Sequence, residues 1–302
     1  MTVVRKIGAG LVVSWLAAVG PAVAQEIEVV ARDVRFPEGP LWSDGSLLFV
    51  EYGGHTIQRL EPDGSLTRLW ERAGCGPAAL AHAGADLLVT CYDENTLVLV
   101  APTGETRRIY DKDDLGLPFV GPNDFAVDAA GGVFMSASGP WETAPIVGKI
   151  LYRAPDGGLR PVADDLHYPN GLALSPDGKT LYCSETYAYR ILAFDVGENG
   201  SLTKRRELAH VNDIAGGGPP LAPDGLKTDA AGNLYVALYE GGKVLVADPT
   251  GKLLATIDPP APKVSNVGFG EDASVLYITG VLDGSQAPWP GEVYKVANPV
   301  RQ

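Results

Sequence analysis

The sequence has few of the side chains that usually cross-link small proteins or hold transition metals. Of its 302 residues, three are cysteine and four are histidine. The cysteines lack the spacing of a zinc site, and their odd number leaves at least one thiol unpaired. Cys75 and Cys91 fall within one copy of the repeat described below and could form a disulfide after export. Cys183 is expected inside a strand, as a small buried hydrophobic residue.

Positive charge is also scarce. The chain carries 24 Lys and Arg against 37 Asp and Glu, a formal net charge of −13 at pH 7. No basic cluster interrupts this acidic background. Because nucleic acids and anionic membranes bind proteins through positive charge, neither is an expected partner. The acidic balance favours solubility and some attraction for cations.

Long apolar runs are absent after the first 24 residues. At the N-terminus, Arg5 and Lys6 precede an apolar stretch over residues 7–19, and Ala22-Val23-Ala24 forms a small-x-small cleavage site. This pattern predicts a signal peptide over residues 1–24, with a mature protein that begins at Gln25 and is periplasmic or secreted. An uncleaved membrane anchor is the alternative, although the run is short for a spanning helix.

Glycine and proline, in contrast, are abundant and recur in an ordered pattern. The chain has 37 Gly and 24 Pro. The pattern is a short apolar strand, a turn such as Pro176-Asp177-Gly178, and a second strand that returns. The starts of six copies are separated by 39, 46, 47, 54 and 42 residues and lie at Glu38, Pro77, Asn123, Asn170, Asp224 and Asn266.

A period in the forties with paired short strands is typical of a β-propeller with one blade per repeat. We therefore predict an all-β fold, a six-bladed β-propeller built from residues 25–302 as one domain. No amphipathic helix is expected in this part of the chain. The N-terminal strand over residues 27–34 is expected to pair beside residues 291–296, because closing the last blade in this way removes an exposed sheet edge.

The first residue of each copy has a special place in such a fold. Inner strands converge on the axis, so these six side chains are expected to form a ring at one mouth of the channel, beside the longer loops. Five of the six carry a carboxylate or amide oxygen, and none is His or Cys. Oxygen ligands suit a hard divalent cation, Ca²⁺ first, with Mg²⁺, Mn²⁺, Fe²⁺ or Zn²⁺ as alternatives. The other interpretation is that Asn-Gly and Asp-Gly are simply turn residues at the blade entrances.

Four motifs in this ring resemble those of the regucalcin, gluconolactonase and luciferin-regenerating-enzyme family, and the likeness runs from about residue 27 to residue 297. The motifs are Phe36-Pro37-Glu38-Gly39-Pro40-Leu41-Trp42, Gly121-Pro122-Asn123-Asp124, Tyr168-Pro169-Asn170-Gly171-Leu172 and Ala222-Pro223-Asp224-Gly225.

This resemblance implies a six-bladed propeller that holds a divalent metal through Glu38, Asn170 and Asp224. It further implies that Asn123 contacts the metal or the substrate and that Asp224 is the general base. Sugar-lactone hydrolases of the family often carry Arg where this chain has Gly121. A direct guanidinium contact to substrate hydroxyls is therefore missing.

Further candidates for substrate contact lie on the same face of the expected ring. Trp141 and Glu142 belong to a long loop of the third repeat, and Tyr187 and Tyr239 share one position at the end of the second strand with Tyr52 and Tyr92. Packing between blades is the alternative role for the tyrosines. None of the four histidines shares a repeat position, so we expect them at the surface or in loops.

Together these features predict an exported hydrolase domain that acts on a small-molecule lactone, either a gluconolactonase-like sugar lactone or a related cyclic ester. A bound cation would polarise the carbonyl, and Asp224 would deprotonate the attacking water. Two alternatives remain open. One is hydrolysis of organophosphates or aryl esters, and the other is a non-catalytic propeller that uses the metal for stability and binds a ligand.

Overall fold

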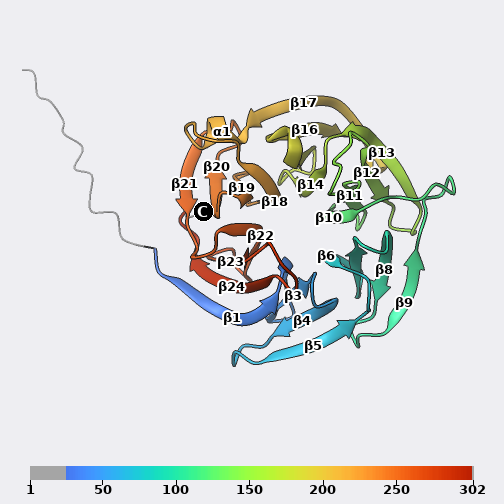
Figure 1. Ribbon diagram of the computed structural model, residues 1–302. Helices are drawn as coiled ribbons and strands as arrows, with labels where there is room; N and C mark the ends of the chain where they lie inside the picture. The colour runs from blue at the N-terminus through green and yellow to red at the C-terminus, as the bar shows by residue number, and fades with distance from the viewer. Residues whose placement is uncertain (1–24, 301–302) are drawn as a thin grey trace, which may run out of the picture.

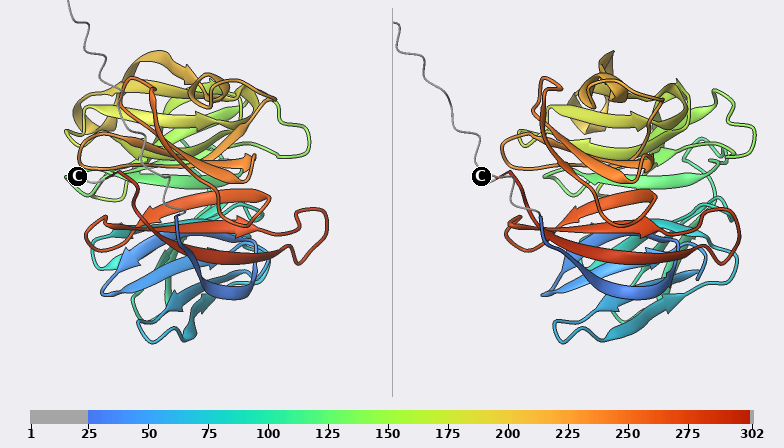
Figure 2. Two further views of the ribbon diagram at one scale, coloured as in Figure 1. Left: turned by 90° about the vertical axis from the view of Figure 1, so that its left-hand side faces the viewer. Right: turned by 60° about the vertical axis from the view of Figure 1, so that its left-hand side comes forward.

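The computed structural model describes residues 25–300, and the expected signal peptide over residues 1–24 lies outside this range. The described chain folds into six four-stranded antiparallel sheets around a central axis (Figure 1). This arrangement confirms the predicted all-β, six-bladed propeller. Figure 2 shows the sheets from the side, stacked around the axis with long connections projecting at one end.

Each blade runs outward from an inner strand at the axis. The first three blades comprise β2 (Pro37–Ser43), β3 (Ser46–Glu51), β4 (Thr56–Leu60) and β5 (Leu66–Glu71); β6 (Pro77–Ala83), β7 (Asp86–Cys91), β8 (Thr96–Val100) and β9 (Thr106–Tyr110); and β10 (Pro122–Val127), β11 (Val133–Ala137), β12 (Gly148–Arg153) and β13 (Leu159–Leu166). The fourth and fifth comprise β14 (Pro169–Leu174), β15 (Thr180–Glu185), β16 (Arg190–Val196) and β17 (Leu202–His210); and β18 (Ala222–Thr228), β19 (Leu234–Glu240), β20 (Lys243–Ala247) and β21 (Leu253–Ile257).

The sixth blade joins the two ends of the chain. It contains β22 (Lys263–Phe269), β23 (Val275–Val281) and β24 (Pro290–Ala297), and its outermost strand is β1 (Ile27–Arg35). Ile27 pairs with Val296 and Val34 with Gly291 (Figure 1). The predicted closure by the N-terminal strand is therefore confirmed, and it leaves the ring without a gap between its first and last strands.

Helical structure is confined to connections. Within the described range it consists of α1 (Val211–Ile214) and the 3-10 turns η1 (Thr186–Ala188) and η2 (Glu198–Gly200). The prediction named no helix, and α1 departs from it by a single turn, too short to carry an amphipathic pattern. No helix in residues 25–300 has the length and apolar character needed to span a membrane.

The hydrophobic core is divided among the interfaces between neighbouring blades. Val50 of β3 packs with Val89 of β7, and Phe134 of β11 packs with Leu172 and Cys183 of the next blade. Burial of each such side chain contributes about 1.5–3 kcal/mol. Cys183 is fully buried, as expected. Cys75 and Cys91 form a disulfide, which resolves the pairing that the sequence left open.

Neighbouring inner strands approach so closely that glycine is required after the ring residues. A Cβ atom on Gly171 would lie 2.4 Å from the carbonyl oxygen of Asp224, and one on Gly225 would lie 2.2 Å from Cγ of Asn266. Both glycines lie inside strands β14 and β18. The Asn-Gly and Asp-Gly pairs are therefore not turn residues, and the glycine lets the next blade pack against the backbone.

Candidate active site

A shift in strand register places the ring side chains. In the fourth blade the pairing of β14 with β15 slips between Pro169 and Leu172, and in the fifth the pairing of β18 with β19 slips between Pro223 and Leu226. Corresponding shifts occur on the inner strand of the other four blades. An irregularity of this kind re-aims a side chain that would otherwise follow the strict alternation of the strand. Asn170 and Asp224 lie inside their shifts.

Three predicted metal ligands come together at the axis. Glu38, Asn170 and Asp224 are each buried, with about 6–7% of their surface exposed. Burial raises the pKa of Glu38 from 4.5 to about 8. Burial also raises the pKa of Asp224 well above its usual value, and the negative charge of Glu38 raises it further, whereas the Asn170 side chain lowers it. The two carboxylates therefore lie close enough to repel each other, with Asn170 beside Asp224.

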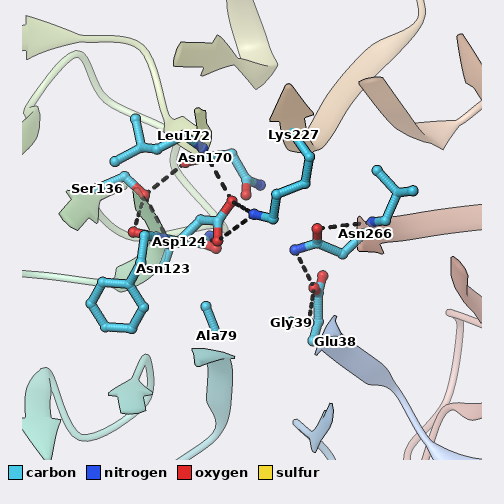
Figure 3. Close-up of polar contacts among 12 residues, drawn as sticks. Glu38, Gly39, Ala79, Asn123, Asp124, Ser136, Asn170, Leu172, Lys227 and Asn266 are labelled. Carbon is cyan, nitrogen blue, oxygen red and sulfur yellow. Dashed lines mark hydrogen bonds and ion pairs between the residues drawn. The ribbon is translucent and has the colours of Figure 1, made fainter. Parts of the chain in front are cut away.

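The Glu38 carboxylate is oriented by a residue of the last blade. Nδ2 of Asn266 donates to Oε2 of Glu38 at 3.1 Å, and the backbone N–H of Gly39 donates to the same oxygen at 3.0 Å (Figure 3). Oδ1 of Asn266 in turn accepts from the N–H of Val267 at 2.9 Å. Asn266, a member of the predicted ring, thus holds the carboxylate and presents its amide nitrogen to it.

Asn123 is anchored through its amide nitrogen. Its Nδ2 donates to the hydroxyl of Ser138 at 3.2 Å, and the side chain is half-buried. This bond does not use the amide oxygen, which is the atom that a cation or a substrate hydroxyl would contact. The position is consistent with the predicted role.

A partly buried ion pair between inner strands is absent from the sequence-based prediction. Nζ of Lys227 lies 3.2 Å from Oδ2 of Asp124, which also accepts from the N–H of Leu172 at 3.1 Å (Figure 3). The pair ties the inner strands β10, β14 and β18 together across the channel. The pair lines a cavity of about 320 Å³ together with Leu80, His82 and Phe125. A lysine inside an inner strand, three residues after Asp224, was the available signal.

Replacing Lys227 by Met is expected to destabilise the protein by about 2–4 kcal/mol, because it leaves the buried Asp124 carboxylate without its cation. The measurement is the free energy of unfolding from a chemical denaturation curve. Lys243→Met is the matched control, since Lys243 pairs at 3.4 Å with Asp258 at the surface and should change stability by less than about 1 kcal/mol. Equal effects of the two substitutions would contradict this role for Lys227.

Above the ring lies a connected set of aromatic side chains, here called the aromatic collar. Trp141 has its ring centroid 5.3 Å from that of Tyr168, 5.4 Å from Tyr187 and 6.3 Å from Tyr239. The ring centroid of Phe36 lies 5.8 Å from that of Tyr239 and 5.4 Å from that of Tyr52, so Phe36 links these two tyrosines. The collar consists of Phe36, Tyr52, Tyr92, Trp141, Tyr168, Tyr187, Tyr239 and Trp289.

The collar faces the buried carboxylates. Burial raises the pKa of Tyr168 and that of Tyr239, and the charge of Asp224 raises both further. Predicted Tyr239 thus lies near the ring carboxylates, and predicted Trp141 and Tyr187 belong to the same cluster because Trp141 packs against both tyrosines. Phe36 and Tyr168, which the prediction did not name as contacts, adopt φ of 50° and 63°. This conformation costs a non-glycine residue about 1–2 kcal/mol.

Glu142, the remaining predicted contact, is exposed on the loop that carries Trp141. Its negative charge is a contributor to the raised pKa values of Tyr92 and Tyr187, in each case after burial. Glu142 therefore lies near the collar at its solvent side, where it adds negative charge to the mouth without contacting Glu38 or Asp224 in the described structure.

The donor set at the ring fits a hard divalent cation. Two buried carboxylates, Glu38 and Asp224, are costly to keep ionised side by side, and a cation between them would remove that cost. In residues 25–300 no group of three His, Cys, Asp or Glu side chains is arranged to hold a metal. The third ligand would therefore be an amide oxygen, which Asn170 can supply and which Ca²⁺ accepts readily.

The arrangement of the four family-like motifs around one axis agrees with a comparison against protein families. Residues 36–281 match the family described as the SMP-30/gluconolactonase/LRE-like region. The chain belongs to this family. Rabbit (Oryctolagus cuniculus) regucalcin is 31% identical to this chain over 294 residues, covering 89% of this chain and 92% of its own length. Regucalcin of Xenopus laevis is 30% identical, with the same coverage of both chains.

Solved structures of related proteins share the fold. A gluconolactonase from Xanthomonas campestris superposes with a TM-score of 0.75 at 25% identity, covering 90% of this chain and 89% of its own. A calcium-binding regucalcin from Agrobacterium tumefaciens has a TM-score of 0.76 at 22% identity, covering 90% and 93%. Membership of the SMP-30/gluconolactonase family supports a lactonase-type hydrolase.

Proposed function

We propose that this SMP-30/gluconolactonase-family protein is a metal-dependent hydrolase of a lactone, either a gluconolactonase-like sugar lactone or a related cyclic ester. The observation that carries the proposal is the buried pair of carboxylates, Glu38 and Asp224, held together with Asn170 at the mouth of the propeller. A cation bound there, Ca²⁺ in the first place, would polarise the substrate carbonyl.

The residues of the chain would supply the proton transfers and the positioning. Asp224 accepts a proton from water as the water oxygen bonds to the carbonyl carbon, and the ring C–O bond then breaks to give a hydroxy acid. The proton held by Asp224 is returned to the leaving oxygen, so the carboxylate is regenerated. Asp224 would act as a carboxylate in this role, because a cation held beside it would keep it ionised.

Hydrolysis of a panel of lactones, followed by acid release with and without a chelator, tests the proposal. Acid release that stops with chelator and returns with one added metal is the expected result. Turnover of a phosphotriester or an aryl ester alone would favour the organophosphate and aryl-ester alternative. No turnover of lactones, phosphotriesters or aryl esters would favour a non-catalytic binding propeller and overturn the proposal.

We further propose that the protein works outside the cytoplasm, after cleavage behind Ala24, on a small molecule and without nucleic acid or membrane as partner. The N-terminal pattern of residues 1–24 and the Cys75–Cys91 disulfide support export, because disulfides persist in oxidising compartments. N-terminal sequencing of protein recovered from the periplasm or the culture medium tests the cleavage site directly.

A further inference from the structure

The position that often carries Arg in sugar-lactone hydrolases of this family is filled by aromatic packing in this chain. Gly121 adopts φ of 61°, and a Cβ atom there would lie 2.6 Å from the carbonyl oxygen of Gly139 and 2.8 Å from the ring of Tyr92. No side chain can extend from this position without displacing Tyr92. The mouth of the propeller therefore presents an aromatic ring at this point.

Four of the five tyrosine hydroxyl groups in the collar donate hydrogen bonds within the protein, and Tyr239 is the exception among the described hydrogen bonds. Tyr52 donates to Asp93 at 2.7 Å, Tyr92 to the carbonyl oxygen of Gly139 at 2.8 Å, and Tyr168 to the hydroxyl of Tyr92 at 3.0 Å. Tyr187 donates to the carbonyl oxygen of Trp141 at 3.3 Å. These tyrosines cannot also donate to a substrate without giving up an internal bond, so the collar offers ring faces and edges more readily than donors.

Such a wall is poorly suited to bind a polyhydroxylated sugar ring. Each sugar hydroxyl that leaves water needs a new hydrogen-bond partner, and a buried hydroxyl without one is costly. A flat apolar group has no such requirement and gains from stacking and edge contacts with the rings. The one lysine of the described residues that packs on the collar does not change this conclusion. Lys263 lies 4.6 Å above the centre of the Tyr239 ring, and its charge is already balanced by an ion pair with Glu240 at 2.6 Å.

Exposed apolar side chains also lie at the rim of the mouth, beside the charge of Glu142. Val120, Ile146, Val147 and Leu282 are all exposed, and Ile146 reaches 60% exposure. Val120 and the loop of Ile146 and Val147 flank the segment that carries Trp141, since the carbonyl oxygen of Val120 accepts from the N–H of Gly139 at 3.0 Å. Trp141 itself is 43% exposed, although it contacts three collar residues. An exposed tryptophan at the centre of an aromatic wall is suited to meet a ligand.

We propose that the lactone hydrolysed by this protein carries a planar apolar group, of the aryl-fused or aryl-substituted class, and that the aromatic collar with Trp141 binds this group beside Glu38 and Asp224. The proposal rests on the lactonase function proposed above and specifies its substrate class. Trp141 is a specificity residue in this scheme, because it contacts the substrate ring and takes no part in proton transfer.

Steady-state kinetics compare two substrates of similar size, dihydrocoumarin with its fused aryl ring and D-glucono-1,5-lactone with its hydroxyls. We expect kcat/KM to be at least about tenfold higher for dihydrocoumarin. Trp141→Ala should raise KM for dihydrocoumarin about tenfold with little change in kcat, and should leave the small aliphatic δ-valerolactone within about twofold. Trp141→Phe should recover most of the loss. Preference for gluconolactone, or equal effects of Trp141→Ala on all lactones, would overturn the proposal.

A binding measurement separates this proposal from the hydrolase proposal. 4-Chromanone keeps the fused aryl ring of dihydrocoumarin and has no ester bond, and its binding is followed by quenching of tryptophan fluorescence. Quenching should be lost in Trp141→Ala and kept in Trp42→Phe, since Trp42 stacks on Tyr277 away from the collar. If no lactone is hydrolysed but this pattern holds, the hydrolase proposal fails and the aromatic site stands. Absence of Trp141-dependent quenching overturns the site whether or not lactones are hydrolysed.

Discussion

Replacing Asp224 by Asn is expected to lower lactone turnover by about 10²–10⁴-fold while the fold is kept. Asparagine has nearly the size of aspartate and can still offer an oxygen to a cation, but its amide cannot accept the proton of the attacking water. In the metal-free protein, removing one of two buried, mutually repelling carboxylates should not weaken the folded state. The measurements are kcat for the most active lactone and the unfolding midpoint of the variant.

Metal binding must be measured alongside, because Asp224 is also a proposed ligand. Calorimetric titration with Ca²⁺ should show retained but weaker binding, and excess metal should not restore turnover. Asp44→Asn is the matched control, since Asp44 is exposed in the turn between β2 and β3 and should leave turnover unchanged. Retention of more than about a tenth of wild-type turnover in Asp224→Asn would refute the general-base role.

Chelation is expected to reverse the dependence of stability on pH. Burial raises the pKa of Glu38 from 4.5 to about 8 and also raises that of Asp224. Without a cation, the folded state therefore binds more protons than the unfolded state between the unfolded and folded pKa values of Glu38, 4.5 and about 8. Its stability falls as pH rises through that window. With a bound cation the carboxylates are held ionised, and stability instead increases as pH rises from acid.

The difference in stability between the metal-bound and the chelated protein should be large near the upper end of this pH window. A ligand at about 1,000 times its dissociation constant stabilises the folded state by about 4 kcal/mol, which corresponds to roughly 10 °C in the unfolding temperature of a chain of this size. Thermal unfolding followed by circular dichroism at about pH 5 and pH 8, with saturating CaCl₂ or with chelator, measures it. Glu38→Gln should flatten the slope seen with chelator. Parallel pH profiles in the two conditions would rule out a cation at this carboxylate pair.

The sequence was sufficient to predict the fold because the signal is repeated. Six copies of one strand-turn-strand pattern each report the same local structure, so an error in one copy does not change the result. The closing role of β1 followed from the need to cover a sheet edge. It could also be predicted that Glu38, Asn170 and Asp224 approach one another, since equivalent positions in a ring of blades share one height along the axis.

Other features depended on contacts between blades that no repeat encodes. The Lys227–Asp124 pair joins residues 103 positions apart, and nothing local to either residue specifies the other. The same holds for the Asn266 amide that orients Glu38 across the junction between the last and first blades. The register shifts that aim the ring side chains are likewise decided by how an inner strand fits its neighbour.

The sequence by itself determined the architecture, the position of the carboxylates and the oxygen-rich character of the ring, because these follow from periodicity and residue type. The tertiary structure decided what surrounds the ring. Gly121 alone indicated only a missing arginine, whereas the folded chain shows that the ring of Tyr92 fills that space and belongs to a wall built from seven different connections and strand β19. Side chains that are remote along the chain become one surface only when the blades close, and the chemistry of that surface is a property of their packing.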